Sequence, residues 1–374
     1  MPIPISATIS GSRSGSVLGQ NEYGTQLDVW MDIMEDLDPG FAEKNGYGWE
    51  RFEGNASTDF GHAFESATIA LTEQKTGLKI IDQERVFEKR LYPQMNNLKN
   101  PMMMSCHVDG IFSGFEQWKH REGNLYELVS DKVLYEGKTA FDMGFRKKWD
   151  IEKDLIPRSY NLQCQHNMYL ADLQEAIVSV LVFPKHPQDL VDEGWEVHEY
   201  EADKYRIIRK DDSGIVKEIA LPLKWTCTLN QMGYHHIFKI KRNDDLIKAM
   251  LEKYQEFWER FVIPRKPPEA MNFDDIKKLC PSPHGTVVLD QDKDKNIISW
   301  INEIRGINKE IGTAGLMPKR KKELTTTVMN YVKDMPAVLE EENTNKLEIK
   351  DGQGFTIATY SKQKDEKRVF RVSK

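Results

Sequence analysis

Hydrophobic positions in the first quarter of the chain follow helical spacing. After Thr25, apolar residues recur every three or four positions, which predicts a helix that starts there. The same spacing over residues 62–76, closed by Gly77, predicts a second helix with a C-terminal stop. Residues 46–61 are rich in Gly, Asn, Ser and Thr, so we expect a loop between the two helices.

Alternating and continuous apolar runs then predict strands. The segments are residues 79–88, 102–112 and 126–139, the buried-strand candidate 177–183, and a hairpin over 195–209 and 214–221. The segments 102–112 and 126–139 are expected to pair as a hairpin or as adjacent strands. Good helix formers over residues 160–173 come after Pro157, a residue that suits the first turn of a helix.

The chain changes character at a cluster of prolines between residues 264 and 268. These prolines end a long amphipathic helix that the pattern predicts over residues 244–262. The elements expected beyond them are two helices, 293–312 and 319–339, and three short strands, 346–350, 354–360 and 367–372. We therefore expect a first domain over residues 1–265 and a small α+β appendage over residues 270–374, whose role the sequence does not indicate.

Composition limits the classes of protein that the chain can be. Its 374 residues carry 52 Lys and Arg against 59 Asp and Glu, a net charge of −7, which excludes a wholly basic nucleic-acid coat but not a local basic groove. The longest apolar run, residues 177–183, is far short of the roughly 20 residues of a membrane helix. No secretory signal opens the chain, so we expect a cytoplasmic protein without membrane contact. The four cysteines form no Cys-x-x-Cys pair, which argues against a zinc ribbon.

Two acids and a lysine lie in the strand-like segments. Asp109 is followed, 27 positions later, by the sequence Glu136-Gly137-Lys138. Residues i and i+2 of a strand point to the same face, so Glu136 and Lys138 project together and Asp109 can converge from the neighbouring strand. Paired carboxylates suit Mg²⁺, and a lysine beside them suits phosphodiester hydrolysis. The alternative is a surface ion pair, but acids within buried-strand sequence are costly unless they are paired or liganded.

Five ordered motifs carry a resemblance to a known family. They are the Gly-Ser segment Ile9–Gly19, Gly61-His62-Ala63-Phe64-Glu65 with Thr76–Lys79, His107-Val108-Asp109-Gly110, Glu136-Gly137-Lys138, and the helix motif of Pro157, Tyr160, Gln163 and Gln165. In this order they resemble the YqaJ-like viral recombinases, relatives of lambda exonuclease in the PD-(D/E)xK nuclease superfamily. The resemblance runs from about residue 8 to residue 265. We therefore expect an α/β fold, with a mixed central sheet flanked by helices as in the restriction-endonuclease-like core.

The resemblance implies a metal site. Asp109 and Glu136 would be metal ligands, the carbonyl of Gly137 a backbone ligand, and Lys138 the catalytic lysine. Glu65 would help to hold a second metal ion or its water. The implied cofactor is Mg²⁺, with Mn²⁺ as the alternative, in a site of two ions.

The same resemblance implies residues around the metal site. Tyr160 and Gln163 would line the active centre from one face of a helix. Ser12 would lie in the pocket that holds the 5′-phosphate of the DNA end. Arg13 stands where the family usually has an aspartate; an arginine could bind phosphate, and we include it with Ser12 as a substrate-binding candidate.

The implied activity is digestion of one strand of a linear duplex from its 5′ end, which leaves 3′ single strands for recombination. The resemblance also implies a ring-shaped homo-oligomer, commonly a trimer, and a single-strand annealing protein as partner. Two alternatives stay open at this point. One is an endonuclease with the same core, and the other is a DNA-binding scaffold without catalysis.

Other charged residues and histidines have simpler interpretations. The run Arg146-Lys147-Lys148 could contact DNA phosphates, whereas the remaining basic runs are expected to be solvated. His107 and His166 are interpreted as satisfied core histidines rather than metal ligands. The adjacent His235-His236 pair is expected to point apart, which makes a shared metal ion unfavourable.

Overall fold

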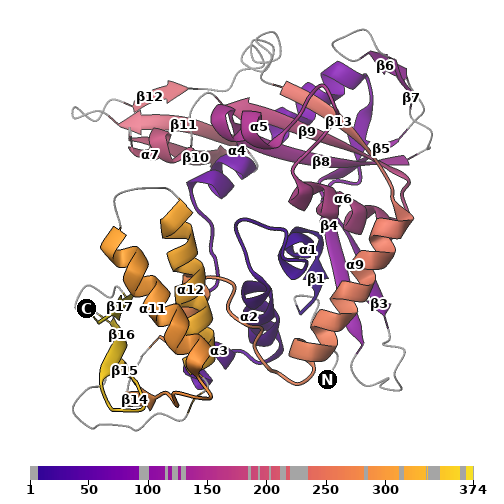
Figure 1. The fold of residues 1–374 in the computed structure, drawn as a ribbon. Helices are drawn as coiled ribbons and strands as arrows, with labels where there is room; N and C mark the ends of the chain where they lie inside the picture. Colours follow the sequence, from indigo (N-terminus) through magenta and orange to yellow (C-terminus); the bar gives the residue numbers. More distant parts are fainter. Residues whose placement is uncertain are drawn as a thin grey trace. The chain divides into compact units, whose positions relative to one another are not determined.

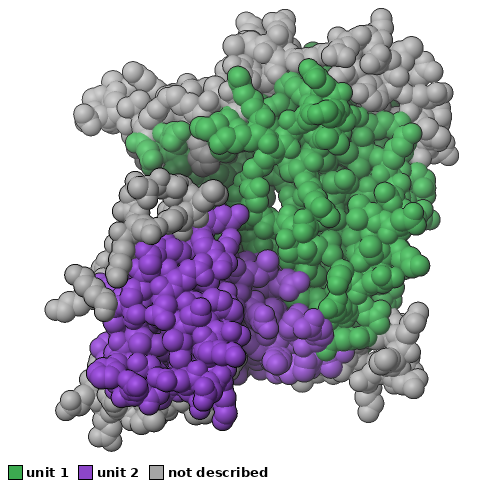
Figure 2. Space-filling view, in the orientation of Figure 1, with its two compact units in different colours: residues 1–24, 52–259 green, residues 25–51, 260–374 purple. Residues whose placement is uncertain are grey.

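A computed structural model describes residues 7–91, 101–113, 117–119, 125–127, 132–183, 187–192, 194–201, 204–210, 216–219, 235–281, 285–310, 316–333, 335, 346–362 and 368–373. The chain divides into two compact units (Figure 1, Figure 2). The first consists of Met1–Gly24 and Phe52–Glu259, and the second of Thr25–Arg51 and Arg260–Lys374. Some predicted positions lie outside the described residues: 128–131, 214–215, 220–221, 311–312, 334, 336–339 and 367.

The first unit is built on a five-stranded mixed sheet of order β13-β9-β8-β5-β2 (Figure 1). Its strands are β2 (Lys79–Ile81), β5 (Gly110–Ser113), β8 (Lys132–Phe141), β9 (Glu175–Phe183) and β13 (His235–Lys241). β8 and β9 run parallel, while the other neighbours are antiparallel. The predicted pairing of the segments 102–112 and 126–139 is therefore confirmed as the β5–β8 ladder. β13 was not predicted.

Helices cover both faces of this sheet, because its inner strand β9 is apolar on both sides. Ile177 of β9 belongs to a cluster against which Ile69 of α4 (Ala56–Thr76) packs. The next residue, Val178, faces the opposite way and clusters with Met168 of α6 (Arg158–Ala171). α5 (Asp142–Lys148) lies on the α6 side through Phe145. The predicted α/β class, with a mixed sheet flanked by helices, is confirmed.

A smaller three-stranded sheet adjoins the central one and has the order β1-β4-β3. Its strands are β1 (Ile9–Ser10), β3 (Arg85–Leu91) and β4 (Met102–Val108). The predicted strand 79–88 is thus two strands in different sheets, separated by Asp82 and Glu84 at φ values of 51° and 57°. Likewise β4 and β5 belong to different sheets, and Asp109 is the single residue between them.

Two predicted helices have different bounds in the structure. α4 begins six residues earlier than expected, at Ala56, because the Asn55 side chain caps its first turn by accepting from the backbone N–H groups of Ser57 and Thr58. Residues 56–61, the C-terminal part of the predicted loop 46–61, are therefore helical. The predicted helix 244–262 is an α-helix, α9 (Asp244–Phe257), that continues as one π-helical turn over Trp258–Val262.

The first unit also contains elements outside these two sheets. They are α1 (Gly11–Val17), β6 (Gln117–Lys119), β7 (Leu125–Glu127), α7 (Pro187–Asp192), β10 (Trp195–Glu201), β11 (Lys204–Lys210) and β12 (Val216–Ile219). The predicted hairpin is a three-stranded antiparallel sheet of order β10-β11-β12. Among the described helices, none is long and apolar enough to cross a membrane.

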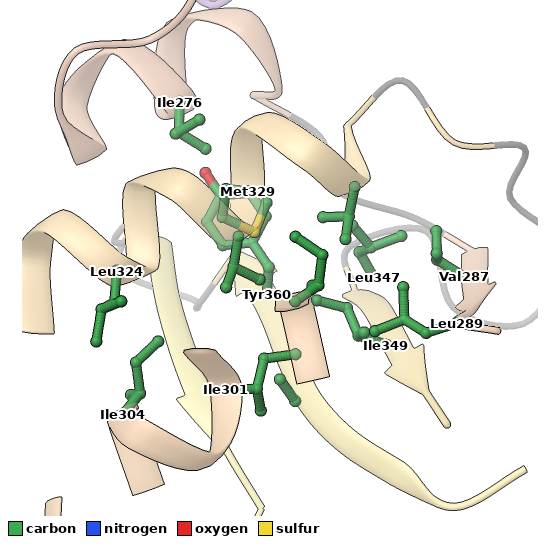
Figure 3. Close-up of a cluster of buried hydrophobic side chains, with 14 of the residues drawn as sticks. Ile276, Val287, Leu289, Ile301, Ile304, Leu324, Met329, Leu347, Ile349 and Tyr360 are labelled. Carbon is green, nitrogen blue, oxygen red and sulfur yellow. The ribbon is translucent and has the colours of Figure 1, made fainter. Parts of the chain in front are cut away.

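The second unit contains a four-stranded sheet of order β14-β15-β16-β17. Its elements are α2 (Gln26–Leu37), α3 (Phe41–Lys44), α10 (Phe273–Leu279), β14 (Gly285–Val288), α11 (Lys295–Glu310), α12 (Leu316–Val332), β15 (Lys346–Lys350), β16 (Thr356–Lys362) and β17 (Arg368–Val372). Figure 3 shows the apolar core between helices and sheet, with Ile301, Met329 and Tyr360 at its centre. The α+β character of the predicted appendage is confirmed, and β14 is an unpredicted strand.

Residues 25–51 belong to this second unit although they precede most of the first. Trp30 of α2 donates its indole N–H to the carbonyl of Phe261 at 2.9 Å, and Lys278 of α10 pairs with Asp28 of α2. The Thr25 hydroxyl, which caps α2, also bonds to buried Asp275 at 3.0 Å. The compact unit that contains the predicted appendage, residues 270–374, therefore also includes residues 25–51 from the N-terminal region.

Candidate active site

The three residues of the sequence motif meet at the end of the β5–β8 ladder. Gly110 pairs with Tyr135, so Asp109 and Glu136 are the next residues of the two antiparallel strands. Asp109 Oδ2 accepts the backbone N–H of Gly137 at 2.8 Å. Lys138 Nζ donates to Glu136 Oε1 at 2.5 Å. The structure therefore brings the two acids and the lysine together, as the sequence predicts.

Helix α6 presents a row of side chains to this cluster. Gln163 donates to Glu136 Oε1 at 2.6 Å, and the Lys138 ammonium lies 5.2 Å from the centre of the Tyr160 ring. Asn167, one turn beyond Gln163, donates to Glu136 Oε2 at 3.2 Å. Sequence reasoning missed Asn167, although its i+4 spacing from Gln163 places both on one helical face.

Burial and neighbouring charges shift the pKa values of Glu136 and Lys138. Glu136 is fully buried, and desolvation together with the negative charge of Asp109 raises its pKa, while Lys138 acts in the opposite direction. Burial disfavours the charged form of Lys138, but the charges of Glu136 and Asp109 outweigh it and raise the pKa of the ammonium. The side chain of Lys138 keeps 17% of its surface exposed. The site therefore holds a protonated lysine beside two acids that repel one another.

Glu65 reaches the same cluster from α4. It is half-buried, and its pKa is raised by desolvation, then by the charges of Asp109 and Glu84, while Lys138 lowers it. These interactions place Glu65 within electrostatic range of Asp109 and Lys138. The role of Glu65 in holding a metal ion stays a prediction.

Ser12 and Arg13 lie on α1, a short helix within the Gly-Ser segment of the sequence motif. Ser12 is exposed and shares a hydrogen bond of 3.1 Å with the hydroxyl of Ser10. Arg13 donates to the carbonyl of Thr8 at 3.0 Å. α1 packs on α6, since a Cβ on Gly15 would contact Ser159 at 3.2 Å. Phosphate binding by Ser12 and Arg13 stays a prediction.

The other residues considered from sequence have structural partners. His166 is buried, with Nε2 3.0 Å from the carbonyl of Ser105 and Nδ1 3.4 Å from the hydroxyl of Tyr254, as expected of a core histidine. His107 is exposed, so its interpretation as a core histidine was wrong. It is the one exposed residue of β4, whose other residues are buried.

His235 and His236 point to opposite faces of the central sheet, as predicted. His235 bonds to Ser179 at 2.7 Å, whereas the ring of His236 stacks on Phe145 at 4.8 Å. In the basic run of α5, Lys148 is paired with Glu22 at 2.5 Å. Contact of this run with DNA stays a prediction.

Paired carboxylates are donors that suit a divalent cation. In the described part of the chain, no group of three or more His, Cys, Asp or Glu side chains is placed so that it could hold a metal ion. However, Asp109 and Glu136 converge, and burial followed by the charge of Asp109 raises the pKa of both Glu136 and Glu65, which a bound cation would counteract. The resemblance implies Asp109, Glu136, the carbonyl of Gly137 and Glu65 as ligands of such an ion.

Comparison with protein families decides the class of this site. The model of the YqaJ-like viral recombinase domain matches residues 6–174. The similarity to this family is therefore shown for residues 6–174 of the chain. This region includes α1, α4, β5, β8 and α6, and therefore every candidate residue named above. The resemblance inferred from the ordered motifs is confirmed.

Known structures are less informative than the family model. The chain resembles the alkaline exonuclease LHK-Exo from Laribacter hongkongensis with 13% identity, coverage of 69% of this chain and 90% of that one, and a TM-score of 0.36. A phage-related exonuclease from Haemophilus somnus 129PT has 17% identity, coverage of 69% and 96%, and a TM-score of 0.38. Such low scores carry no conclusion about function. No curated protein matches the sequence significantly.

Proposed function

We propose that the YqaJ-like domain is a divalent-metal-dependent exonuclease that digests one strand of a linear DNA duplex from its 5′ end and leaves 3′ single strands for recombination. The observation that carries the proposal is the grouping of Asp109, Glu136 and Lys138 in a buried setting, with donors from α6 around them. Two repelling acids and a lysine that stays charged cost stability, and hydrolysis of a phosphodiester is the chemistry that uses all three.

The residues of the chain have separate tasks in this reaction. Asp109, Glu136, the Gly137 carbonyl and Glu65 would hold two ions of Mg²⁺ or Mn²⁺, which would supply an activated water and neutralise phosphate charge. The Lys138 ammonium stabilises negative charge that develops on the phosphodiester, and its two acidic neighbours keep it protonated. Gln163 and the Gly137 N–H hold Glu136 and Asp109 in fixed orientations.

Recognition of the DNA end belongs to α1 in this proposal. Ser12 and Arg13 offer a hydroxyl and a guanidinium to a 5′-phosphate. The family resemblance adds a trimeric ring around the duplex, a single-strand annealing protein as partner, and the cytoplasm of a bacterial or phage-infected cell as the location. A dependence of the rate on the 5′-phosphate would support this role of α1.

The test is a nuclease assay with Mg²⁺ on three substrates: linear duplex with 5′-phosphate, linear duplex with 5′-hydroxyl, and covalently closed circular DNA. We expect digestion of the linear substrates only, faster with the 5′-phosphate, and its loss on addition of EDTA. Lys138→Ala should abolish digestion. Lys153→Ala is the matched control, because Lys153 is an exposed lysine of the same unit that pairs with Asp150 at 3.0 Å.

The other outcomes separate the alternatives. Cleavage of the circular substrate would replace the exonuclease by an endonuclease with the same core. Binding of DNA without cleavage in the presence of Mg²⁺ or Mn²⁺ would leave a DNA-binding scaffold. Full activity of Lys138→Ala would remove the proposed role of this lysine.

A further inference from the structure

Asn167 is a buried neighbour of Glu136 that lies outside the recognised motifs. Its Nδ2 is 3.2 Å from Glu136 Oε2, whereas Lys138 and Gln163 both donate to the other carboxylate oxygen. A carboxylate offers only acceptors, so the nitrogen of the Asn167 amide has to face it. Asn167 is thus the donor that orients the second oxygen of Glu136.

The other end of the same amide meets α1. Within the described residues, Asn167 Oδ1 is buried and has no hydrogen-bond partner. A Cβ on Gly11 would lie 2.1 Å from this oxygen and 3.1 Å from Asn167 Cγ. Glycine at position 11 is therefore what allows the first turn of α1 to approach the amide. Gly11 directly precedes Ser12, the candidate phosphate-binding residue.

We infer that Asn167 is a positioning residue, which holds Glu136 Oε2 on one side and seats α1 through Gly11 on the other. The two contacts use opposite ends of one planar amide, so a displacement at either end is transmitted to the other. The catalytic part of this inference rests on the proposed function. The seating of α1 does not, because it concerns only the packing of α1 on α6.

The catalytic part is tested with Asn167→Ala. We expect a kcat lower by about 10- to 100-fold with KM for DNA unchanged, and Mn²⁺ affinity, measured by calorimetry without DNA, weaker by about 10-fold. Asn161→Ala is the control, because Asn161 lies on the same helix and contacts Gln165 at 3.2 Å. Wild-type values of kcat and Mn²⁺ affinity in Asn167→Ala would overturn the positioning role.

The seating of α1 is tested by a double-mutant cycle of melting temperatures. Gly11→Ala should lower Tm in the wild-type background and lower it less in the Asn167→Ala background, where the atom 2.1 Å away is missing. Gly15→Ala, whose Cβ would meet Ser159 instead, should change Tm equally in both backgrounds. Equal effects of Gly11→Ala in both backgrounds would overturn the link. These measurements use no DNA, so lack of nuclease activity in the wild type would count against the proposed function alone.

Discussion

The two compact units bury different kinds of side chain. In the first unit Glu136, His166 and Asn167 are at most 1% exposed, and each has a polar contact. In the second unit the core consists of aliphatic side chains around Tyr360 (Figure 3). A buried polar group is costly unless it is paired, whereas an aliphatic core is stabilising throughout. The costly buried polar groups named here lie in the first unit, which also contains the candidate active site.

Buried acids in the second unit do not weaken this comparison. Asp275 accepts the backbone N–H of Met271, and Asp294 accepts that of Asp290. Each carboxylate thus satisfies local backbone near a helix start, which is an ordinary structural task. In the first unit Glu136 accepts only side-chain donors from a neighbouring strand position and a distant helix. The same residue class is therefore used for structure in one unit and for a site in the other.

The largest effect is expected for Asp109→Asn. The asparagine keeps an oxygen for the Gly137 N–H but removes a charge of the proposed metal site and the repulsion with Glu136. Nuclease activity should fall by about 10³-fold, while Tm stays equal or rises. Parallel nuclease assays and thermal unfolding would check this. A lower Tm with retained activity would mean that Asp109 is structural.

The opposite pattern is expected for Ile301→Ala in the second unit. Ile301 is fully buried in the aliphatic core, so the free energy of unfolding should fall by about 3 kcal/mol. The nuclease rate per folded molecule should not change. Denaturant unfolding measures the loss, with Lys295→Ala on the exposed side of the same helix as control. A loss of activity without a loss of stability would contradict the contrast between the units.

The buried His166 should make the first unit sensitive to acid. Desolvation lowers the pKa of this imidazole to about 4, against an ordinary value of 6.5, so the unfolded chain binds the proton more readily. Stability is then lost as the pH falls from about 6.5 to about 4, by up to about 3 kcal/mol. His166→Gln should flatten the pH dependence of unfolding in this range, whereas His107→Gln, at an exposed position, should not. Equal slopes in both variants would contradict the assignment.

The smallest effect concerns the cap of α2. The Thr25 hydroxyl accepts the backbone N–H of Asp28 and bonds to Asp275. Thr25→Ala should lower the free energy of unfolding by about 1 kcal/mol, and Thr25→Ser should largely restore it. Chemical denaturation of both variants would measure the difference. Equal losses in the two variants would show that the hydroxyl is not what stabilises the helix start.

The sequence predicted those parts of the site that depend on local geometry. Glu136 and Lys138 share a face because they are two residues apart on a strand, and Tyr160 and Gln163 share a face of a helix. The partnership of β5 with β8 also followed from the alternation of apolar residues. To predict these features, it is enough to know the period of a strand or helix and that β5 pairs with β8.

What the sequence did not predict depends on contacts between distant segments. β13 was missed, although its apolar residues pair with β9 across more than fifty positions, from Lys241 with Glu175 to His235 with Leu181. The membership of residues 25–51 in the second unit depends on Trp30 meeting Phe261. Asn167 is an ordinary polar residue in the sequence and becomes informative only when Gly11 lies against it. Tertiary packing alone supplies this information.

Asp109 is the single residue between β4 of the smaller sheet and β5 of the central sheet. Its distance from Glu136 is therefore a property of how two ladders join, and of neither ladder alone. A substitution on β3 or β4 that rotates the smaller sheet by a few degrees would move one acid and leave the other in place. Substitutions far from the site can therefore alter the spacing between Asp109 and Glu136. That spacing sets the size of the ion that the proposed metal site would accept.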